Sequence, residues 1–344
     1  MTGYLLRENA PLEAHNTLRV PSRAALFADV RSEAGLAELL NQPYLQSNPT
    51  LIIGEGSNLL FVGDFEGIVL RLGWLGMETV EHEGPRRRVR VAAGERWDDL
   101  VRWSVGKGLY GLENLALIPG SVGAAPIQNI GAYGVEVANS LVWVEAFDRQ
   151  RKQSVQLSAE QCQFAYRDSL FKRETGRWVI TAVCFDLHEQ GELKLDYAGV
   201  REELAHLGIS EPRPLHAAEV ISRIRVRKLP NPALLPNAGS FFKNPEVPAT
   251  TAAAIGDEFP EMPQFAGTNG RVKLSAAWLI ERSGMRGLRE GDAAIAEQHA
   301  LVLVNHGRAS GEQLLSLARK VAAQVEQRFA IRLEPEVRLI GATW

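Results

Sequence analysis

The chain has 344 residues, and its 38 lysines and arginines against 41 aspartates and glutamates give a formal net charge of −3. That length predicts two or three domains with enough chain for a large buried core. The 45% of hydrophobic and 23% of charged residues are typical of a globular protein and exclude a disordered or fibrous one. The near-neutral balance argues against a nucleic-acid partner, because nucleic-acid-binding proteins usually carry a basic surplus.

The first third of the chain has an α/β pattern. Apolar spacing predicts helices over residues 24–40 and 97–105. Apolar or alternating runs predict strands at residues 50–53, 67–72 and 86–91. The arginine run at 86–88 is compatible with an anion site, but a solvated strand face is the favoured interpretation.

Strands dominate the middle of the chain, and helices follow. The stretch 141–187 predicts an α+β unit rather than a regular βαβ array. Further helices are predicted at 217–227, 274–283 and in a last segment that begins with a capping box of Ser310 and Gln313. The tail at 331–340 returns to strand character.

Residues 114–135 carry no charge, which raises the question of a membrane span. The prolines and glycines within this stretch would break a helix, so we expect loops and no membrane partner. Two cysteines, Cys162 and Cys184, lack a CxxC spacing and are expected to be reduced core thiols. The seven histidines form no HxxxH or HExxH pattern, so no metal site is expected.

Two glycine-rich motifs suggest a phosphate-containing ligand. GEGSNLL at 54–60 follows an apolar strand, but Leu59 stands where a dinucleotide fingerprint needs a glycine, so alone it favours a plain turn. GSVGAAPIQNIGAYG at 120–134 is typical of an ordered loop around a flat or phosphorylated ligand, although a purely structural loop remains an alternative. Few basic residues accompany the two motifs, which favours backbone amides holding the diphosphate of a resident dinucleotide. No GxxxxGK[ST] motif occurs, so a P-loop is excluded.

Four polar clusters place reactive side chains among apolar residues or in Gly/Pro turns. They are FAYRDSLFK with Arg167, RKLPNP with Lys228, NAGSFFKNP with Ser240 and LEPEVRLIG with Glu336. Taken singly, each is better explained as surface chemistry. Ser240 lacks a G-x-S-x-G turn, which disfavours a hydrolase nucleophile.

Taken together, the motifs GEGSNLL, GSVGAAPIQNIGAYG, FAYRDS, RKLP, GSFFKNP and EPEVR occur in the order seen in one family. The chain resembles the UDP-N-acetylenolpyruvoylglucosamine reductases, also called UDP-N-acetylmuramate dehydrogenases, which are flavoenzymes of bacterial peptidoglycan synthesis. The resemblance covers residues 16–341, and Tyr197 in KLDYAGV is similar to the longer, type I form.

The resemblance implies an α+β protein with an FAD-binding fold of the vanillyl-alcohol-oxidase type, made of two α+β subdomains, plus a third α+β substrate-binding domain. The expected domains are residues 1–75 with 330–344, residues 76–228 and residues 229–329. A cytoplasmic monomer that acts on small molecules is expected.

The family's site residues carry over onto matching positions. Arg167, Ser240 and Glu336 resemble the catalytic residues; Tyr197, Lys228 and Asn244 resemble ligands of the UDP diphosphate, and His299 stands at a substrate position that can hold glutamine. FAD is expected to bind tightly and non-covalently. The positions that the resemblance assigns to it are Gly54, Glu55, Gly56, Ser57, Asn58, Leu59, Gly120, Ser121, Val122, Gly123, Ile127, Gly131 and Ala132.

The implied reaction runs in two halves. NADPH reduces FAD and leaves; UDP-N-acetylglucosamine enolpyruvate then accepts hydride at its β-carbon and becomes UDP-N-acetylmuramate. Arg167 and a protonated Glu336 are expected to stabilise the enolate. Ser240 is expected to protonate the α-carbon.

Three departures from the family pattern concern binding rather than catalysis. Ala124 and Ala125 replace serines found in many members, and Phe265 replaces a tyrosine.

A flavin oxidase for an alcohol or hydroxy acid and a non-catalytic UDP-sugar sensor are the competing interpretations, and a nicotinamide Rossmann dehydrogenase ranks last.

Overall fold

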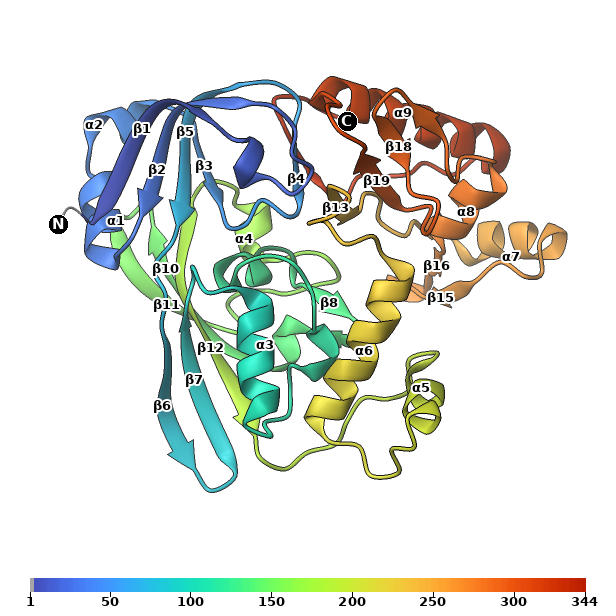
Figure 1. Cartoon of the computed structure of the whole chain (residues 1–344), viewed down its shortest axis with the longest axis horizontal. Coiled ribbons are helices and arrows are strands. Elements are labelled where there is room, and N and C mark those ends of the chain that lie inside the picture. The colour runs from blue at the N-terminus through green and yellow to red at the C-terminus, as the bar shows by residue number, and fades with distance from the viewer. Residues whose placement is uncertain (1–2) are drawn as a thin grey trace. The chain divides into compact units, whose positions relative to one another are not determined.

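The computed structural model describes residues 3–344, and the chain divides into two compact units (Figure 1). Unit 1 comprises Met1–Ala10, Ala24–Glu55 and Glu66–Arg227. Unit 2 comprises Pro11–Arg23, Gly56–Phe65 and Lys228–Trp344. Each unit is therefore assembled from segments that lie far apart in the sequence.

One sheet of unit 1 has the strand order β1-β2-β5-β3, and its β3–β5 pair is parallel. Helices α1 and α2 follow its second strand in the chain. The bounds are β1 (Tyr4–Pro11), β2 (Arg23–Val30), α1 (Glu33–Leu40), α2 (Pro43–Ser47), β3 (Thr50–Ile53) and β5 (Phe65–Leu72).

The prediction of a helix over residues 24–40 is wrong in its first half, where β2 lies. Its buried residues Ala24, Phe27 and Ala28 have helical spacing, yet β2 lies between two partner strands. The helix begins only at Glu33, where the Ser32 hydroxyl caps it by accepting a 3.0 Å hydrogen bond from the Gly35 N–H.

The larger sheet of unit 1 has five strands in the order β11-β10-β12-β7-β6, and every neighbouring pair is antiparallel. Helix α3 lies against it in Figure 1, and its Trp97 contacts Phe185 of β12 edge to face with 5.8 Å between ring centroids. This agrees with the α+β pattern predicted for the middle of the chain. The bounds are β6 (Met77–Glu83), β7 (Arg86–Ala92), α3 (Trp97–Gly106), β10 (Leu141–Asp148), β11 (Gln153–Ser158) and β12 (Trp178–His188).

The arginines of β7 form ion pairs along the sheet rather than an open anion site. Arg86 pairs with Asp186 at 2.9 Å, and Arg88 pairs with Glu81 at 2.6 Å. These pairs agree with the favoured strand-face interpretation.

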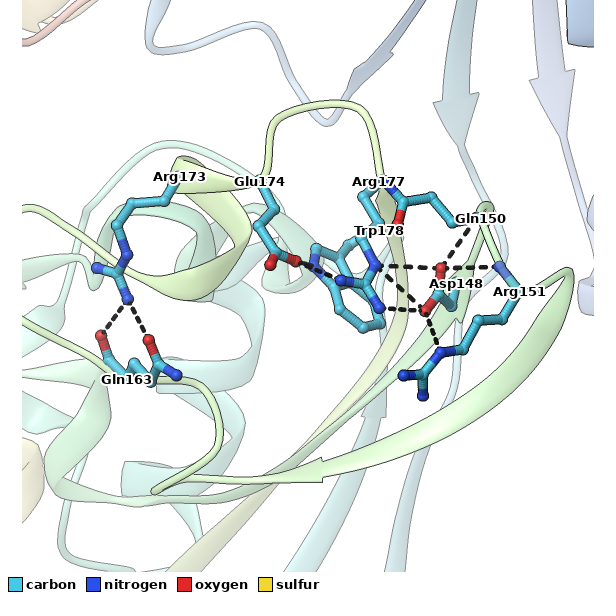
Figure 2. Close-up of polar contacts among 8 residues, drawn as sticks. All are labelled: Asp148, Gln150, Arg151, Gln163, Arg173, Glu174, Arg177 and Trp178. Carbon is cyan, nitrogen blue, oxygen red and sulfur yellow. Dashed lines mark hydrogen bonds and ion pairs between the residues drawn. The ribbon is translucent and has the colours of Figure 1, made fainter.

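A buried ion pair closes the end of β10. Asp148 is fully buried and accepts a 2.7 Å hydrogen bond from Nη2 of Arg177, as Figure 2 shows. The N–H groups of Gln150 and Arg151 donate to the same carboxylate at 2.9 and 3.2 Å. These contacts lower the pKa of Asp148 to about 2, with the Arg177 hydrogen bonds as the largest cause.

Helices and short strands complete unit 1. Helix α6 is slightly longer than predicted and buries Ala217, Val220 and Ile224. The bounds are β8 (Gly131–Ala132), β9 (Val135–Glu136), α4 (Leu170–Arg173), α5 (Val200–His206) and α6 (Pro214–Lys228).

Unit 2 contains a four-stranded sheet in the order β13-β19-β18-β17, a three-stranded sheet in the order β14-β16-β15, and the parallel pair β4–β20. Helix α9 packs on β18 and β19 and begins with the predicted capping box of Ser310 and Gln313. The bounds are β4 (Leu59–Phe61), β13 (Asn237–Ser240), β14 (Glu246–Val247), α7 (Ala249–Glu258), β15 (Gln264–Ala266), β16 (Val272–Leu274), α8 (Ala276–Arg282), β17 (Arg289–Glu290), β18 (Ala293–Ile295), β19 (Val302–Asn305), α9 (Gly311–Phe329) and β20 (Arg338–Ile340).

The strand expected over residues 331–340 is realised only in its last three residues, as β20. Pro335 has no N–H to donate to a ladder, and it forms only an isolated bridge with Phe242. Between residues 3 and 344, no helix is long and apolar enough to cross a membrane.

Candidate functional site

The two glycine motifs meet in unit 1. A Cβ atom at Gly54 would lie 2.2 Å from the Oγ atom of Ser121, so only glycine permits this approach. The Glu55 carboxylate accepts a 3.0 Å hydrogen bond from the Gly120 N–H and a 2.9 Å hydrogen bond from Nε of Arg96. The end of β3 is thereby tied to the start of the 120–134 loop.

The 120–134 loop folds back tightly on the larger sheet. Its N-terminal half is a 3₁₀ helix, Val122–Gln128, and the Gly123 N–H donates a 2.9 Å hydrogen bond to the carbonyl of Ala93. A Cβ atom at Gly123 would lie 2.6 Å from Cβ of Ala93. The second half contains the short β8–β9 pair, which includes the predicted FAD positions Gly131 and Ala132.

Arg167 lies against this same loop. Its Nη2 donates a 2.8 Å hydrogen bond to the Gly131 carbonyl, and its own carbonyl accepts a 2.7 Å hydrogen bond from Nζ of Lys172. Asn129 of the loop donates a 3.1 Å hydrogen bond to the Ala165 carbonyl. The structure therefore brings one predicted catalytic residue to the predicted cofactor loop.

Tyr197 is also brought to the 120–134 loop. Its ring lies edge to face against the Tyr133 ring, with 4.8 Å between centroids and 66° between planes. Tyr197 is 45% exposed, as a residue that meets a soluble ligand must be. Tyr133 was not singled out in the sequence, although its place in GAYG was a usable signal.

The second half of the first glycine motif belongs to unit 2. Gly56 has a φ of +66°, and a Cβ atom there would lie 2.1 Å from the His15 carbonyl oxygen. Asn58 donates a 3.4 Å hydrogen bond from Nδ2 to the Glu336 carbonyl, and its own carbonyl accepts a 3.1 Å hydrogen bond from the Arg338 N–H. Glu336 is thus held at a glycine turn of the predicted cofactor site.

Ser240 lies beside Glu336 in the same unit. Ser240 ends β13 and pairs with Val302 of β19. The next residue, Phe241, accepts a 2.7 Å hydrogen bond from the Glu336 N–H through its carbonyl. This backbone hydrogen bond therefore brings Ser240 and Glu336, two predicted catalytic residues from distant motifs, to neighbouring positions.

Two of the predicted substrate ligands of unit 2, Lys228 and His299, lie near each other. His299 is half-buried, and this burial lowers its pKa. The positive charges of Lys228 and Arg286 lower the pKa of His299 further, so Lys228 lies within electrostatic reach of it. Asn244 accepts a 3.0 Å hydrogen bond from the Ala276 N–H at the start of α8. That amide oxygen has a structural partner, and the amide nitrogen of Asn244 is the group that suits a phosphate oxygen.

The three residues that depart from the family pattern differ in how far they are buried. Ala125 is buried in the 3₁₀ helix, Ala124 is half-buried beside it, and Phe265 of β15 is 52% exposed. None of the three alters a contact of Arg167 or Ser240 described above.

The residues present fit an FAD diphosphate. The two glycine motifs contact each other, and a side chain at Gly54, Gly56, Gly123 or Gly131 would collide with its neighbours. The 114–135 segment has no charged side chain before Glu136. Such a backbone-lined turn is suited to phosphate oxygens, which backbone N–H groups bind.

The structure offers no alternative centre for chemistry by metal or thiol within residues 3–344. No group of three or more His, Cys, Asp or Glu side chains there is arranged to hold a metal. Cys162 and Cys184 are free, buried thiols, and burial raises the pKa of each to about 12. At neutral pH both therefore stay protonated and unreactive.

Comparisons with known proteins agree with this geometry. The profile described as UDP-N-acetylenolpyruvoylglucosamine reductase, C-terminal domain, matches residues 231–340, and that of an FAD binding domain matches residues 24–152. The UDP-N-acetylenolpyruvoylglucosamine reductase of Xylella fastidiosa (strain M12) is 49% identical over 99% of this chain and 97% of its own length. That of Xanthomonas euvesicatoria pv. vesicatoria (strain 85-10) is 49% identical over 100% and 98%.

A solved structure extends the agreement to the fold. The UDP-N-acetylenolpyruvylglucosamine reductase of Thermus caldophilus has a TM-score of 0.67 and 25% identity, and the match covers 98% of each chain. The α+β fold with an FAD-binding domain is thereby confirmed. The chain belongs to the UDP-N-acetylenolpyruvoylglucosamine reductase family of FAD-dependent oxidoreductases.

Proposed function

We propose that the chain reduces UDP-N-acetylglucosamine enolpyruvate to UDP-N-acetylmuramate for peptidoglycan synthesis, with NADPH as reductant and with Arg167, Ser240 and Glu336 as the catalytic residues. The observation that carries the proposal is the hydrogen bond from the Glu336 N–H to the Phe241 carbonyl, which joins EPEV to the Ser240 loop. Asn58 of the first glycine motif extends this contact toward the cofactor turn.

FAD is held tightly and non-covalently by backbone amides of the two glycine motifs. Glu55 fixes the junction of these motifs through Gly120, so its carboxylate supports the turn rather than facing a phosphate. When bound, FAD supplies the hydride that NADPH has delivered. Neither motif contains a His or Cys for a covalent flavin link.

Arg167 binds the substrate carboxylate and stabilises the charge that develops on the enolate. A guanidinium offers two parallel donors to a carboxylate. The hydrogen bond to Gly131 fixes one of its nitrogen atoms, so little side-chain entropy is lost when substrate binds.

Ser240 donates its hydroxyl proton to the substrate α-carbon. A serine hydroxyl is a weak acid in water, but proton transfer to a strongly basic enolate carbon at about 3 Å is favourable. A protonated Glu336 donates a hydrogen bond to the same enolate and limits the charge that Arg167 must carry.

The sugar nucleotide is held by Lys228, Tyr197 and Asn244. Lys228 supplies positive charge to the diphosphate, and Tyr197 and Asn244 supply uncharged donors. His299 is neutral at pH 7 because burial and Lys228 lower its pKa, so it contributes hydrogen bonds rather than charge.

Three further properties complete the proposal. The enzyme is a cytoplasmic monomer without nucleic-acid or membrane partners. Its three domains are residues 1–75 with 330–344, residues 76–228 and residues 229–329. The flavin stays bound through purification and is released by acid precipitation.

Spectrophotometry of the purified holoenzyme tests this function. NADPH should bleach the flavin absorbance, and the enolpyruvyl sugar nucleotide should restore it without oxygen, whereas UDP-N-acetylglucosamine should not. Reoxidation by oxygen alone at the turnover rate would instead identify a flavin oxidase. A sugar nucleotide that binds without restoring the flavin would identify a sensor. Yellow colour in the acid-precipitated protein would contradict non-covalent binding.

A further inference from the structure

One buried side chain joins the 120–134 loop to the segment that carries Tyr197. Asn114 is 1% exposed, and its Nδ2 donates a 2.9 Å hydrogen bond to the Tyr133 carbonyl and a 2.8 Å hydrogen bond to the Lys194 carbonyl. An amide nitrogen carries two hydrogens, so both are used here, and an amide oxygen in the same place would face two carbonyl oxygens. Asn114 is 19 positions from Tyr133 and 80 positions from Lys194, so this connection exists only in the folded chain.

Asn114 lies on a backbone that helix α3 holds in place. Trp97 donates a 2.9 Å hydrogen bond from Nε1 to the Leu115 carbonyl, and the Asp98 carboxylate accepts a 2.7 Å hydrogen bond from the Leu117 N–H. Trp97 and Asp98 both lie in the first turn of α3. The backbone around Asn114 is therefore fixed by a helix to which neither of its two hydrogen-bond partners belongs.

The segment that carries Tyr197 has no regular secondary structure. Residues 191–196 form neither helix nor strand; Leu195 is buried, whereas Tyr197 is exposed. The Tyr197 ring meets the Tyr133 ring edge to face. Tyr133 has a φ of +51°, a left-handed conformation that a tyrosine holds only when its surroundings fix it. The hydrogen bonds of Asn114 and this ring pair therefore join the same two segments through backbone and side chain.

The Asn114 side chain is not arranged for stability alone. Its Oδ1 is buried, and no group within residues 3–344 donates a hydrogen bond to that atom. A buried acceptor without a donor costs stability, and an apolar side chain of the same shape would carry no such cost. The contribution of this asparagine is therefore the pair of hydrogen bonds that its Nδ2 donates.

We propose that Asn114 is a positioning residue for the sugar-nucleotide site: its amide fixes the 194–197 segment to the glycine loop and so places Tyr197 for the substrate diphosphate. The inference rests on the proposed function of Tyr197. Tyr133 directly follows Gly131 and Ala132, so the same amide sets Tyr197 relative to two of the proposed FAD positions. Without its two hydrogen bonds, Tyr197 has to be ordered by the substrate, which weakens binding without touching the chemical step.

Substrate binding by Asn114→Leu and Asn114→Ala tests the proposal. Both variants remove the two donors, and leucine also keeps the approximate volume of the side chain. Titration of the oxidised holoenzyme with UDP-N-acetylglucosamine enolpyruvate, followed by the flavin absorbance, should give a Kd about 10-fold above wild type, the cost of ordering one or two side chains on binding. The KM should rise by the same factor, while kcat and the rate of flavin reduction by NADPH stay within about 2-fold of wild type.

Ser140→Ala is the matched control. The Ser140 hydroxyl donates a 2.9 Å hydrogen bond to the Gly111 carbonyl, close to Asn114 in the chain, so its loss loosens the same region without touching Tyr133 or Lys194. The control should leave the Kd and the KM unchanged. An equal rise of the Kd in Ser140→Ala would show general loosening and overturn the inference, as would a wild-type Kd in the Asn114 variants.

A double-mutant cycle tests whether Asn114 acts through Tyr197. When Tyr197 is already alanine, Asn114→Leu should raise the KM by less than about 2-fold. Multiplicative effects would overturn the inference. Asn114→Ala places no apolar group against the two carbonyls, so it decides the same cycle if Asn114→Leu fails to fold. Failure of the proposed function is distinct, because wild type itself would then not oxidise NADPH when the sugar nucleotide is added.

Discussion

The N–H of Glu336 donates a 2.7 Å hydrogen bond to the carbonyl of Phe241, the residue that follows Ser240. The EPEV segment and the GSFFKNP loop lie far apart in the sequence, and this bond holds their reactive residues at neighbouring backbone positions. Since β13 also pairs with β19 at Ser240, the serine backbone is fixed from two sides. If Ser240 is the proton donor, as proposed, a hydroxyl on so fixed a backbone needs little reorganisation when the enolate forms.

Replacing Ser240 by alanine should separate the two half-reactions. NADPH should reduce the flavin at close to the wild-type rate, because that step needs no proton at the substrate carbon. Reoxidation by the enolpyruvyl sugar nucleotide should slow by about 10²–10⁴-fold, the usual value of general acid catalysis. Stopped-flow absorbance measures each half separately.

Ser283→Ala is the matched control for this prediction. Ser283 is a buried serine of unit 2 whose hydroxyl donates a 2.8 Å hydrogen bond to the Leu279 carbonyl of α8. It should affect stability and leave both half-reactions intact. Equal slowing of both halves in Ser240→Ala would show that Ser240 serves packing and not proton transfer.

Replacing Lys228 by alanine should weaken substrate binding. Loss of a charge-assisted contact to the diphosphate should raise the sugar-nucleotide KM roughly 10- to 100-fold, with a smaller effect on kcat. Lys320→Ala removes a lysine of α9 that pairs with Glu290 of β17, and it should leave the KM unchanged. A KM in Lys228→Ala that matches this control would remove Lys228 from the site.

The candidate site was predictable from the sequence because its motifs are short and local. Gly54, Gly123 and Ser240 lie in short motifs that can be recognised from their residue types alone. The edge-to-face contact of Tyr133 with Tyr197 was not predictable in this way, because the glycine loop and the KLDYAGV segment meet only in the folded chain.

The fold was harder to predict where one segment satisfies two periodicities. Ala24, Phe27 and Ala28 have the spacing of a helix face, yet they lie in β2. Pairing with the strands on either side outweighs the local preference, and no local pattern reports those partners. The division into three domains stays a prediction.

Stability below pH 4 should depend on Asp148. Its pKa is lowered to about 2 in the folded chain, against about 3.9 in an unfolded chain. The folded state therefore gains stability from this carboxylate above about pH 4, and the gain is lost as the pH falls toward 2. Asp148→Asn should lower the free energy of unfolding at pH 7 by about 2–4 kcal/mol, because Arg177 loses its buried partner.

Urea denaturation of wild type and Asp148→Asn across pH 3–7 measures this difference. The gap between the two midpoints should narrow as the pH falls, because protonated aspartate and asparagine are alike in charge. Glu219→Gln breaks an exposed pair with Arg223 and should change stability by less than about 0.5 kcal/mol. If the difference between the two urea midpoints stays constant with pH, Asp148 stabilises the fold through its shape and not through its charge.

Replacing Gly123 by alanine should weaken FAD binding while the fold survives. The added Cβ would lie 2.6 Å from Cβ of Ala93, and Ala93 cannot retreat because its N–H donates a 2.9 Å hydrogen bond to the Thr181 carbonyl of β12. The start of the 120–134 loop must move instead, at a cost of about 1–3 kcal/mol, which corresponds to a 5- to 150-fold weaker FAD complex.

The flavin-to-protein absorbance ratio after ultrafiltration reports the loss of FAD from Gly123→Ala, and added FAD should restore activity. Gly106→Ala at the exposed end of α3 meets no atom within 4 Å and should keep its flavin. Full flavin retention in Gly123→Ala would show that the FAD diphosphate does not rest on this turn.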